Sequence, residues 1–248
     1  MIVMASSPIS GWVAAVFLVA FLVWLNARTR VQVGSGWMWV RVAATCLLLT
    51  WLLAVPVSEF IHRRMPHVTG QRTDHLVVIG DSISSGIDAH TPAWPAFFQL
   101  QTGIPVRSLS RPGAGVVEAR GTTYQVKPQD TLILIEIGGN DLLSGTPAAE
   151  FGRGLDSLLS SLATPGRTLV MFELPLLPHK IGFGQMQRRL SSKYGVFLIP
   201  KHFFTQVLSG ADATSDGLHL SESGARRMSA LVERTLSPAL KLTEPSTR

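Results

Sequence analysis

Short β-rich runs alternate with helical segments from residue 75 to residue 236, and this alternation limits the possible folds more than any other feature of the sequence. Strands are predicted at 75–79, 106–109, 131–137, 168–174 and 196–199, and helices at 92–101, 115–124, 147–162, 184–194 and 221–236. Strands joined through helices form βαβ units, in which the strands run parallel and helices cover both faces of the sheet. The sequence therefore predicts an α/β fold built on a five-stranded parallel sheet.

Two apolar runs without a charge, residues 9–25 and 42–58, precede this pattern, and each is seventeen residues long. This length lies near the lower limit, roughly 17–25 residues, for a helix that spans a bilayer. A cleaved signal peptide and a buried core hairpin are the alternatives, but no positive segment precedes the first run and no globular partner adjoins the pair. We therefore predict a membrane hairpin over 1–60, with two transmembrane helices at about 9–25 and 40–58.

The net charge of +6 is unevenly divided along the chain. Up to residue 73, six Arg against one Glu leave +5, and beyond it sixteen Lys and Arg against fifteen Asp and Glu leave +1. Because the excess flanks the apolar runs, it favours membrane lipid as a partner and argues against nucleic acid. A polar stretch before residue 75 predicts a linker over 61–73, a globular domain over 74–240 and a tail over 241–248.

Cys46 is the only cysteine, so the chain has no internal disulfide and no Cys-x-x-Cys motif. No pair of histidines has metal-ligand spacing such as His-x-x-x-His. We predict neither a metal nor a cofactor. The chemistry must then come from ordinary side chains.

Reactive groups gather at the carboxyl ends of strands in open α/β sheets. Ser82 follows the first predicted strand in a Gly-Asp-Ser run, and Asp216-x-x-His219 lies in a late loop before the last helix. A serine hydroxyl becomes a useful nucleophile when a base accepts its proton, and His219 could be that base. Asp216 could orient the imidazole and stabilise its charged form. These residues predict nucleophilic catalysis by serine.

Acyl transfer also needs hydrogen-bond donors for the developing oxyanion. The backbone N–H of Ser82, the Asn140 amide and the backbone of Gly113 are the candidates, since each follows a predicted strand. Asp81 is expected to hold the turn before Ser82 through backbone hydrogen bonds. Glu136 lies in an otherwise apolar strand, and a buried polar brace is the favoured interpretation.

These blocks resemble those of the SGNH (GDSL) hydrolase family. The likeness rests on Gly80-Asp81-Ser82, Gly113, Gly139-Asn140-Asp141 and Asp216-x-x-His219 in this order, and it spans about residues 74–240. The run Glu136–Asp141 is similar to that of the bacterial thioesterase/lysophospholipase branch. One departure is Ser108, where the family usually has Asn, and it makes Gly115 an alternative to Gly113.

The resemblance implies a three-layer α/β/α sandwich of the SGNH-hydrolase (flavodoxin-like) type. It also implies Ser82 as nucleophile, His219 as base and Asp216 as its orienting acid, with Ser82, Gly113 and Asn140 forming the oxyanion hole. The expected function is a membrane-anchored serine esterase that cleaves ester or thioester bonds of a small-molecule, lipid or polysaccharide substrate. An O-acyltransferase that modifies sugar or lipid hydroxyls, and a non-catalytic binding domain, are the alternatives. Relatives of this branch act outside the cytoplasm, so we expect a two-span protein of a bacterial inner membrane with a periplasmic catalytic domain.

Overall fold

A twisted parallel sheet forms the centre of the globular part. The computed structural model describes residues 11–29, 35–87, 92–176 and 178–241. Within these ranges the sheet contains β1 (Leu76–Gly80), β2 (Val106–Ser108), β3 (Leu132–Glu136), β4 (Thr168–Phe172) and β5 (Phe197–Ile199). The strand order is β2-β1-β3-β4-β5, and every neighbouring pair is parallel. The predicted five-stranded parallel sheet is confirmed.

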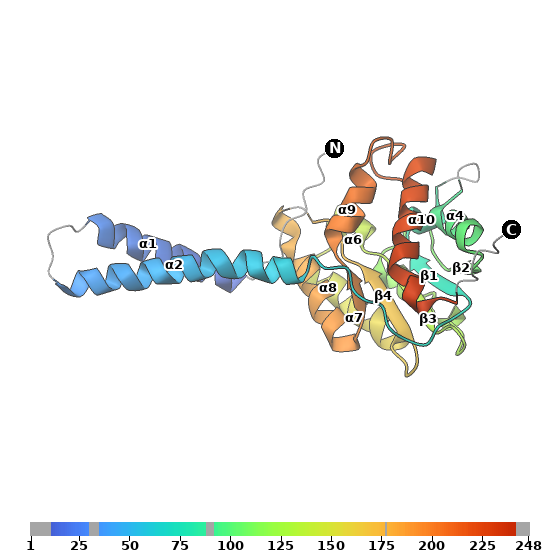
Figure 1. Ribbon diagram of the computed structural model, residues 1–248, viewed down its shortest axis with the longest axis horizontal. Coiled ribbons are helices and arrows are strands. Elements are labelled where there is room, and N and C mark those ends of the chain that lie inside the picture. Colours follow the sequence, from blue (N-terminus) through green and yellow to red (C-terminus); the bar gives the residue numbers. More distant parts are fainter. Residues whose placement is uncertain (1–10, 30–34, 88–91, 177, 242–248) are drawn as a thin grey trace. The chain divides into compact units, whose positions relative to one another are not determined.

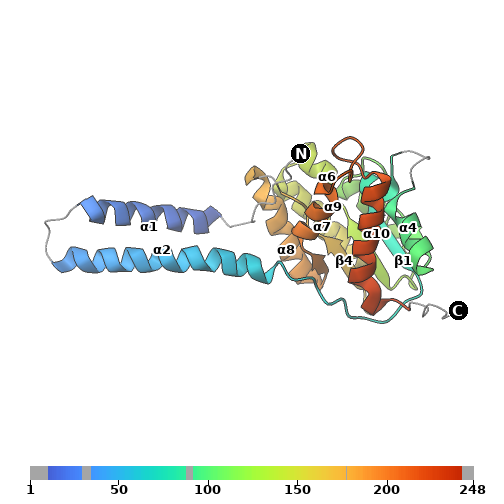
Figure 2. The same ribbon diagram turned by 45° about the horizontal axis from the view of Figure 1, so that its top comes forward.

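Helices cover both faces of this sheet and complete three layers (Figure 1). On one face lie α4 (Trp94–Thr102), α9 (Lys201–Ser209) and α10 (Glu222–Leu236). On the other lie α5 (Val116–Arg120), α7 (Ala148–Leu162) and α8 (Ile181–Tyr194). Figure 2 shows the same arrangement from a second direction. Short helical segments are α3 (Ser82–Ser85), α6 (Gly139–Leu143), η1 (Thr123–Gln125), η2 (Pro178–Lys180) and η3 (Ser237–Ala239).

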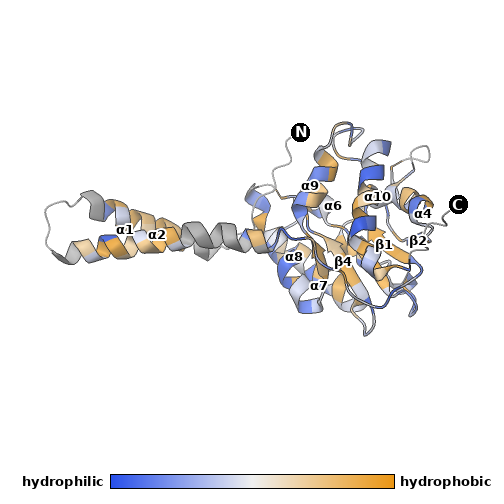
Figure 3. Cartoon of the chain, in the orientation of Figure 1, coloured by the Kyte–Doolittle hydropathy of each residue, from blue (hydrophilic) through white to orange (hydrophobic). Residues whose placement is uncertain are grey.

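The central strand β3 explains why the strands read as nearly continuous apolar runs. Successive side chains of a strand point to opposite faces. Leu132 and Leu134 join the cluster under α4, α9 and α10, whereas Ile133 and Ile135 join the cluster under α5, α7 and α8. All four are buried, because both faces of the sheet are covered. The hydropathy colouring of Figure 3 shows β1 and β4 as apolar elements in the interior.

The helix α9 was not expected from the sequence. Its apolar residues recur as adjacent pairs four positions apart, Phe203 with Phe204 and Val207 with Leu208, which is the spacing of one helical face. Nine residues between a strand and a glycine-containing loop make a weak signal for a helix, because the apolar spacing repeats only once. The other predicted helices are found within a few residues of their expected bounds, which is the usual scatter at helix ends.

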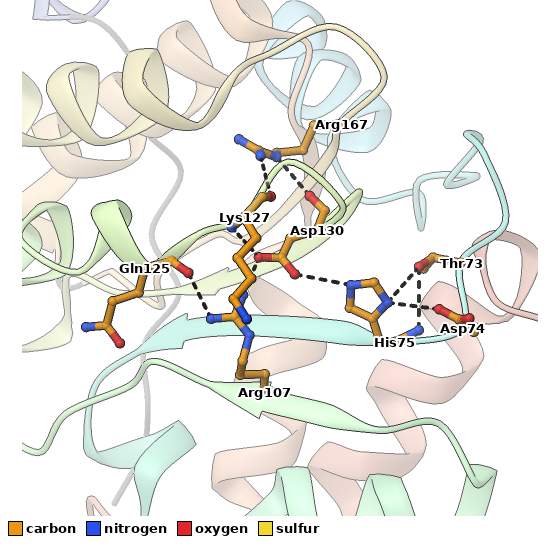
Figure 4. A network of polar contacts seen from close by, with 8 residues as sticks. All are labelled: Thr73, Asp74, His75, Arg107, Gln125, Lys127, Asp130 and Arg167. Atoms are coloured by element: carbon orange, nitrogen blue, oxygen red, sulfur yellow. Dashed lines mark hydrogen bonds and ion pairs between the residues drawn. The ribbon is translucent and has the colours of Figure 1, made fainter.

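A polar network joins β2 to the amino ends of β1, β3 and β4, at the end of the sheet opposite Ser82 (Figure 4). Asp130 is the shared acceptor: its carboxylate bonds His75 Nε2 at 3.2 Å, the Arg107 guanidinium and the Lys127 backbone N–H. The Arg167 guanidinium donates to the Asp130 carbonyl oxygen at 2.9 Å. Asp130 is only 2% exposed, so these bonds compensate the burial of its charge.

The amino-terminal part forms a compact unit of its own, Ser7–Arg64, separate from the unit that holds Met65–Arg248. It consists of α1 (Gly11–Thr29) and α2 (Ser35–Ile61), which pack against each other. Two small side chains, Ala20 and Ala44, are buried in this unit. Small residues let helix backbones approach closely.

The expected membrane location is wrong. Among the residues that the structure describes, no helix combines the length and the apolarity that a bilayer crossing takes. Spanning a bilayer needs about 20 consecutive apolar residues, and each predicted span rested on an uncharged run of seventeen. The two helices that these runs predict are present, but the prediction that they span a membrane has no support. The start of the first span, residues 9–10, and most of the predicted tail lie outside the described residues.

Part of the segment predicted as a linker packs onto the globular unit. Val68 is fully buried in the cluster under α10, and Met65 packs against the same cluster. Thr73 pairs with Leu240 in a parallel bridge, through the bonds Thr73 N to Ala239 O and Lys241 N to Thr73 O. The globular unit therefore includes residues before the first strand.

Candidate active site

Ser82 lies at the turn between β1 and α3, at the carboxyl end of the sheet. Asp81 caps α3: its Oδ1 accepts the Ile83 backbone N–H at 2.9 Å, which confirms that Asp81 holds this turn. A Cβ atom at Gly80 would lie 2.8 Å from the Glu136 carbonyl oxygen, so only glycine fits between β1 and β3 here. The Ser82 side chain is placed at a helix start, where backbone N–H groups lack intrahelical partners.

Asp216 and His219 form a hydrogen-bonded pair in the loop before α10. His219 Nδ1 lies 2.6 Å from Asp216 Oδ2. The other oxygen, Oδ1, accepts the backbone N–H groups of His219 at 2.8 Å and Leu218 at 2.9 Å. The His219 side chain, followed by these two N–H groups, holds the pKa of Asp216 far below its usual range. Asp216 is therefore a fixed anion, and an Nδ1–H donated to it leaves Nε2 of His219 as the free acceptor.

Asn140 and Gly113 come from the loops after β3 and β2. Asn140 Nδ2 donates to the Ala114 carbonyl oxygen at 3.0 Å and to Asp81 Oδ2 at 3.3 Å. Gly113 has a φ of +74°, a left-handed conformation that favours glycine. It lines a cavity of about 460 Å³ together with Asn140. The loop after β2 is fixed to α6 because Asp141 Oδ2 accepts the Val116 N–H at 3.0 Å.

Ser82 lines two cavities, and each brings it together with a different part of the predicted site. The first, of about 220 Å³, contains Ser82 and His219 in its wall. The second, of about 370 Å³, contains Ser82 and Asn140. Apolar side chains make up most of the second wall; they are Ile83, Leu142, Leu143, Leu174, Pro175, Phe204, Leu208 and Leu218.

The apolar cavity depends on the segment after β4. The strand β4 ends at Phe172, so Leu174, predicted as the last residue of that strand, lies with Pro175 in the segment after it, and both line the cavity. Gln187 of α8 fixes this segment, because its Oε1 accepts the Leu174 N–H at 2.9 Å and its Nε2 donates to the Phe172 carbonyl oxygen at 3.0 Å. The remaining wall includes Phe204 and Leu208 of α9. Sequence reasoning missed them because it missed the helix.

A buried pair of carboxyl groups lies directly behind Ser82. Asp81 is 3% exposed and Glu136 is 2% exposed, and their side chains are hydrogen-bonded to each other. Ser84 Oγ donates to Glu136 Oε2 at 2.8 Å and accepts the Trp94 indole N–H at 3.1 Å. Burial raises the pKa of Asp81 to about 6. Burial, followed by the charge of Asp81, raises the pKa of Glu136 well above its usual value.

Residues 78–227, more than half of the chain, match the model of the GDSL-like Lipase/Acylhydrolase family. The chain belongs to this family. It is an ester-bond hydrolase, which rules against the alternative of a non-catalytic binding domain. The matched residues run from β1 to α10 and so include every predicted site residue.

Similar proteins agree with this assignment. Esterase TesA of Pseudomonas aeruginosa is 26% identical over 180 residues, which cover 66% of this chain and 89% of that protein. An arylesterase of Vibrio mimicus is 28% identical over 163 residues, covering 60% of this chain and 81% of that protein. The crystal structure of TesA superposes with a TM-score of 0.59 at 25% identity, covering 67% of this chain and 99% of that one. The fold is therefore that of TesA-type SGNH hydrolases.

Proposed function

We propose that the chain cleaves acyl esters through an acyl-enzyme formed on Ser82, with His219 as base and Asp216 as its orienting anion. The observation that carries the proposal is the position of Ser82, which lines one cavity with His219 and another with Asn140. A nucleophile needs a base on one side and oxyanion donors on the other. Ser82 has a candidate for each.

The first half of the reaction transfers the acyl group to the enzyme. Ser82 Oγ attacks the ester carbonyl carbon, and its proton passes to Nε2 of His219. The negative charge that develops on the carbonyl oxygen is stabilised by the Ser82 and Gly113 N–H groups and by the Asn140 amide. The imidazolium is stabilised by Asp216, whose carboxylate lies 2.6 Å from Nδ1. Collapse of the intermediate breaks the ester bond, and the leaving alcohol or thiol takes the proton from His219.

The second half releases the acyl group to water. His219 accepts a proton from the water molecule as its oxygen attacks the acyl carbon, and it then returns that proton to Ser82 Oγ as the acyl bond breaks. The same three oxyanion donors act again, because the second tetrahedral intermediate has its charge on the same oxygen.

The substrate's acyl part is an aliphatic chain, held in the apolar cavity of about 370 Å³. Each CH₂ group that leaves water contributes about 0.8 kcal/mol, so a chain of several carbons gains affinity there. The cavity shared with His219 then takes the leaving group, since His219 must reach that group to protonate it.

The Ser82→Ala variant tests the proposal. Purified wild-type protein should release p-nitrophenol from p-nitrophenyl butyrate and octanoate and should be labelled by a fluorophosphonate probe. Ser82→Ala should lose the labelling and at least about 10³-fold of kcat, because no other group can form the acyl-enzyme.

Ser85→Ala is the matched control. Ser85 lies on the same short helix and bonds only its neighbour's carbonyl oxygen, Gly86 O, at 3.0 Å. This variant should keep both activity and labelling. Equal labelling of wild type and Ser82→Ala would refute Ser82 as the nucleophile.

A further inference from the structure

The carboxyl pair Asp81–Glu136 is enclosed by hydrogen bonds that define the role of each oxygen. Asp81 Oδ1 accepts from Ile83 N at 2.9 Å, and Oδ2 accepts from Asn140 Nδ2 at 3.3 Å. Glu136 Oε2 accepts from Ser84 Oγ at 2.8 Å. Asp81 therefore receives donors at both oxygens, which is the pattern of an ionised carboxylate. The Asp81 backbone N–H is a further donor to the Glu136 carboxyl group.

Two carboxyl groups form a hydrogen bond to each other only when one of them carries a proton, because an ionised carboxylate has none to donate. Two like charges in contact inside the protein would also repel strongly. Asp81 accepts a hydrogen bond at each oxygen, whereas burial, followed by the charge of Asp81, raises the pKa of Glu136 well above its usual value. The proton therefore belongs on Glu136.

Resting on the function proposed above, we propose that Glu136 is a positioning residue. As a neutral acid it donates a hydrogen bond to Asp81, so that Asp81 orients the Asn140 amide but binds it weakly enough for the oxyanion to take its place. Glu136 is in the wall of the apolar cavity, but it reaches Asn140 only through Asp81. The chain runs from Trp94 through Ser84, Glu136 and Asp81 to Asn140.

The shared proton also sets the charge beside the reaction centre. In the substrate-free enzyme both N–H groups of the Asn140 amide have acceptors, Ala114 O and Asp81 Oδ2. The bond to Asp81, at 3.3 Å, is the longer one, so it is the one that the oxyanion replaces. A proton donated by Glu136 reduces the hold of Asp81 on this amide. A second negative charge would strengthen that hold and would repel the developing oxyanion.

Two substitutions, Glu136→Gln and Glu136→Ala, distinguish the hydrogen bonds of Glu136 from its ability to lose a proton. Gln keeps an N–H for Asp81 and an oxygen for Ser84, so kcat at neutral pH should stay within about threefold of wild type. Ala removes both bonds, and kcat should fall about 100-fold with little change in KM, as when an oxyanion donor is lost. Equal losses in the two variants, or full activity of Glu136→Ala, would overturn the proposal.

The pH dependence gives a readout that a purely structural role would not affect. Wild type loses the shared proton as pH rises, whereas Gln cannot lose one, so the ratio of wild-type kcat to Glu136→Gln kcat should fall with increasing pH. The other charged groups that face the pair, His219 and Asp141, are present in both proteins and cancel in the ratio. Glu173→Gln, at a carboxylate buried after β4 and bonded to Arg188, is the control and should keep the wild-type profile. A constant ratio would contradict the shared proton.

Thermal unfolding tests the pair without using activity. A carboxyl group whose pKa is higher in the folded than in the unfolded state loses its stabilising effect as pH rises through that interval. Between pH 5 and pH 8, wild type should therefore lose more Tm than Glu136→Gln, and equal losses would refute the proton. If instead the wild-type enzyme has no esterase activity, the proposed function fails while this comparison still reports on the pair.

Discussion

The orientation and the charge of the Asp216 carboxylate are set by hydrogen bonds from neighbouring residues, although its side chain is exposed to solvent. Its side chain is 49% exposed, yet both oxygens are engaged by hydrogen bonds from within its own loop. The lowered pKa means that Asp216 is ionised throughout the range in which His219 can act as a base. Loss of activity in acid is therefore not expected from Asp216.

We predict that the Asp216→Asn variant loses activity. Asn keeps the size and an acceptor oxygen but removes the charge, so it neither stabilises the imidazolium nor holds the correct tautomer. We expect kcat to fall by about 10²–10⁴-fold with little change in KM. Steady-state kinetics with p-nitrophenyl butyrate measures this, and labelling by the fluorophosphonate probe should slow in parallel.

Asp212→Asn is its control, since Asp212 lies in the same loop with a φ of +52° that Asn tolerates. Its activity should equal that of wild type. A similar loss in both variants would mean that the loop, and not the Asp216 charge, is responsible.

At the scale of elements, helix α9 closes the apolar cavity with Phe204 and Leu208. Phe204 also packs against Phe172 of β4, with ring centroids 5.2 Å apart and ring planes tilted by 41°, so it is part of the core. Leu208 is half-buried and can be enlarged with less damage to packing. The length of acyl chain that the enzyme accepts should therefore be set from α9.

Leu208→Trp is the element-scale prediction. The larger side chain fills part of the cavity, so kcat/KM for the octanoate ester should fall at least about 10-fold while the acetate ester changes little, since each CH₂ group contributes about 0.8 kcal/mol. A series of p-nitrophenyl esters measures the shift. Leu100→Trp, at an exposed position of α4, should leave the series unchanged. An equal loss for all chain lengths would argue against the cavity as the acyl site.

In the globular unit, the candidate catalytic residues and the buried polar network around Asp130 lie at opposite ends of the sheet. The carboxyl ends of β1 and β3 carry Ser82 and Asn140, and the amino ends carry the network around Asp130 (Figure 4). From Asp130, which precedes β3, the network reaches the starts of β1 and β4 through His75 and Arg167, and it reaches β2 through Arg107. A substitution in the Asp130 network should therefore lower stability without changing the geometry of the candidate active site.

We predict that the Asp130→Asn variant is less stable but equally active. It leaves the partly buried Arg107 without its counter-charge, and we expect a loss of about 2 kcal/mol in the free energy of unfolding. The kcat of the folded protein should not change. Urea unfolding and kinetics measure the two effects. Asp156→Asn, at an exposed ion pair with Lys193, is the control and should have little effect on stability. A fall in kcat for Asp130→Asn would show that the two ends are coupled.

The order of strands and helices along the chain could largely be predicted because β1, β3 and β4 are buried on both faces and therefore read as short apolar runs. The Gly-Asp-Ser, Gly-Gly-Asn-Asp and Asp-x-x-His runs could also be found, because turns at strand ends and the bond within Asp216–His219 are local in the chain. Membrane spans could not be inferred from the same kind of evidence. A run of seventeen apolar residues predicts a helix whether or not that helix crosses a membrane.

The fold class, the family and the candidate catalytic residues can be read from the sequence, because they depend on periodicity and on contacts a few residues apart. Contacts between residues far apart in the chain cannot be read in this way, because they form only in the folded protein. Glu136 bonds Ser84 across 52 positions and Asn140 bonds Asp81 across 59, while Leu208 reaches the cavity from a helix that is absent from the predicted elements. A side chain's burial and its proton depend on such long-range neighbours. The roles of Glu136 and α9 therefore became visible only once the chain was folded.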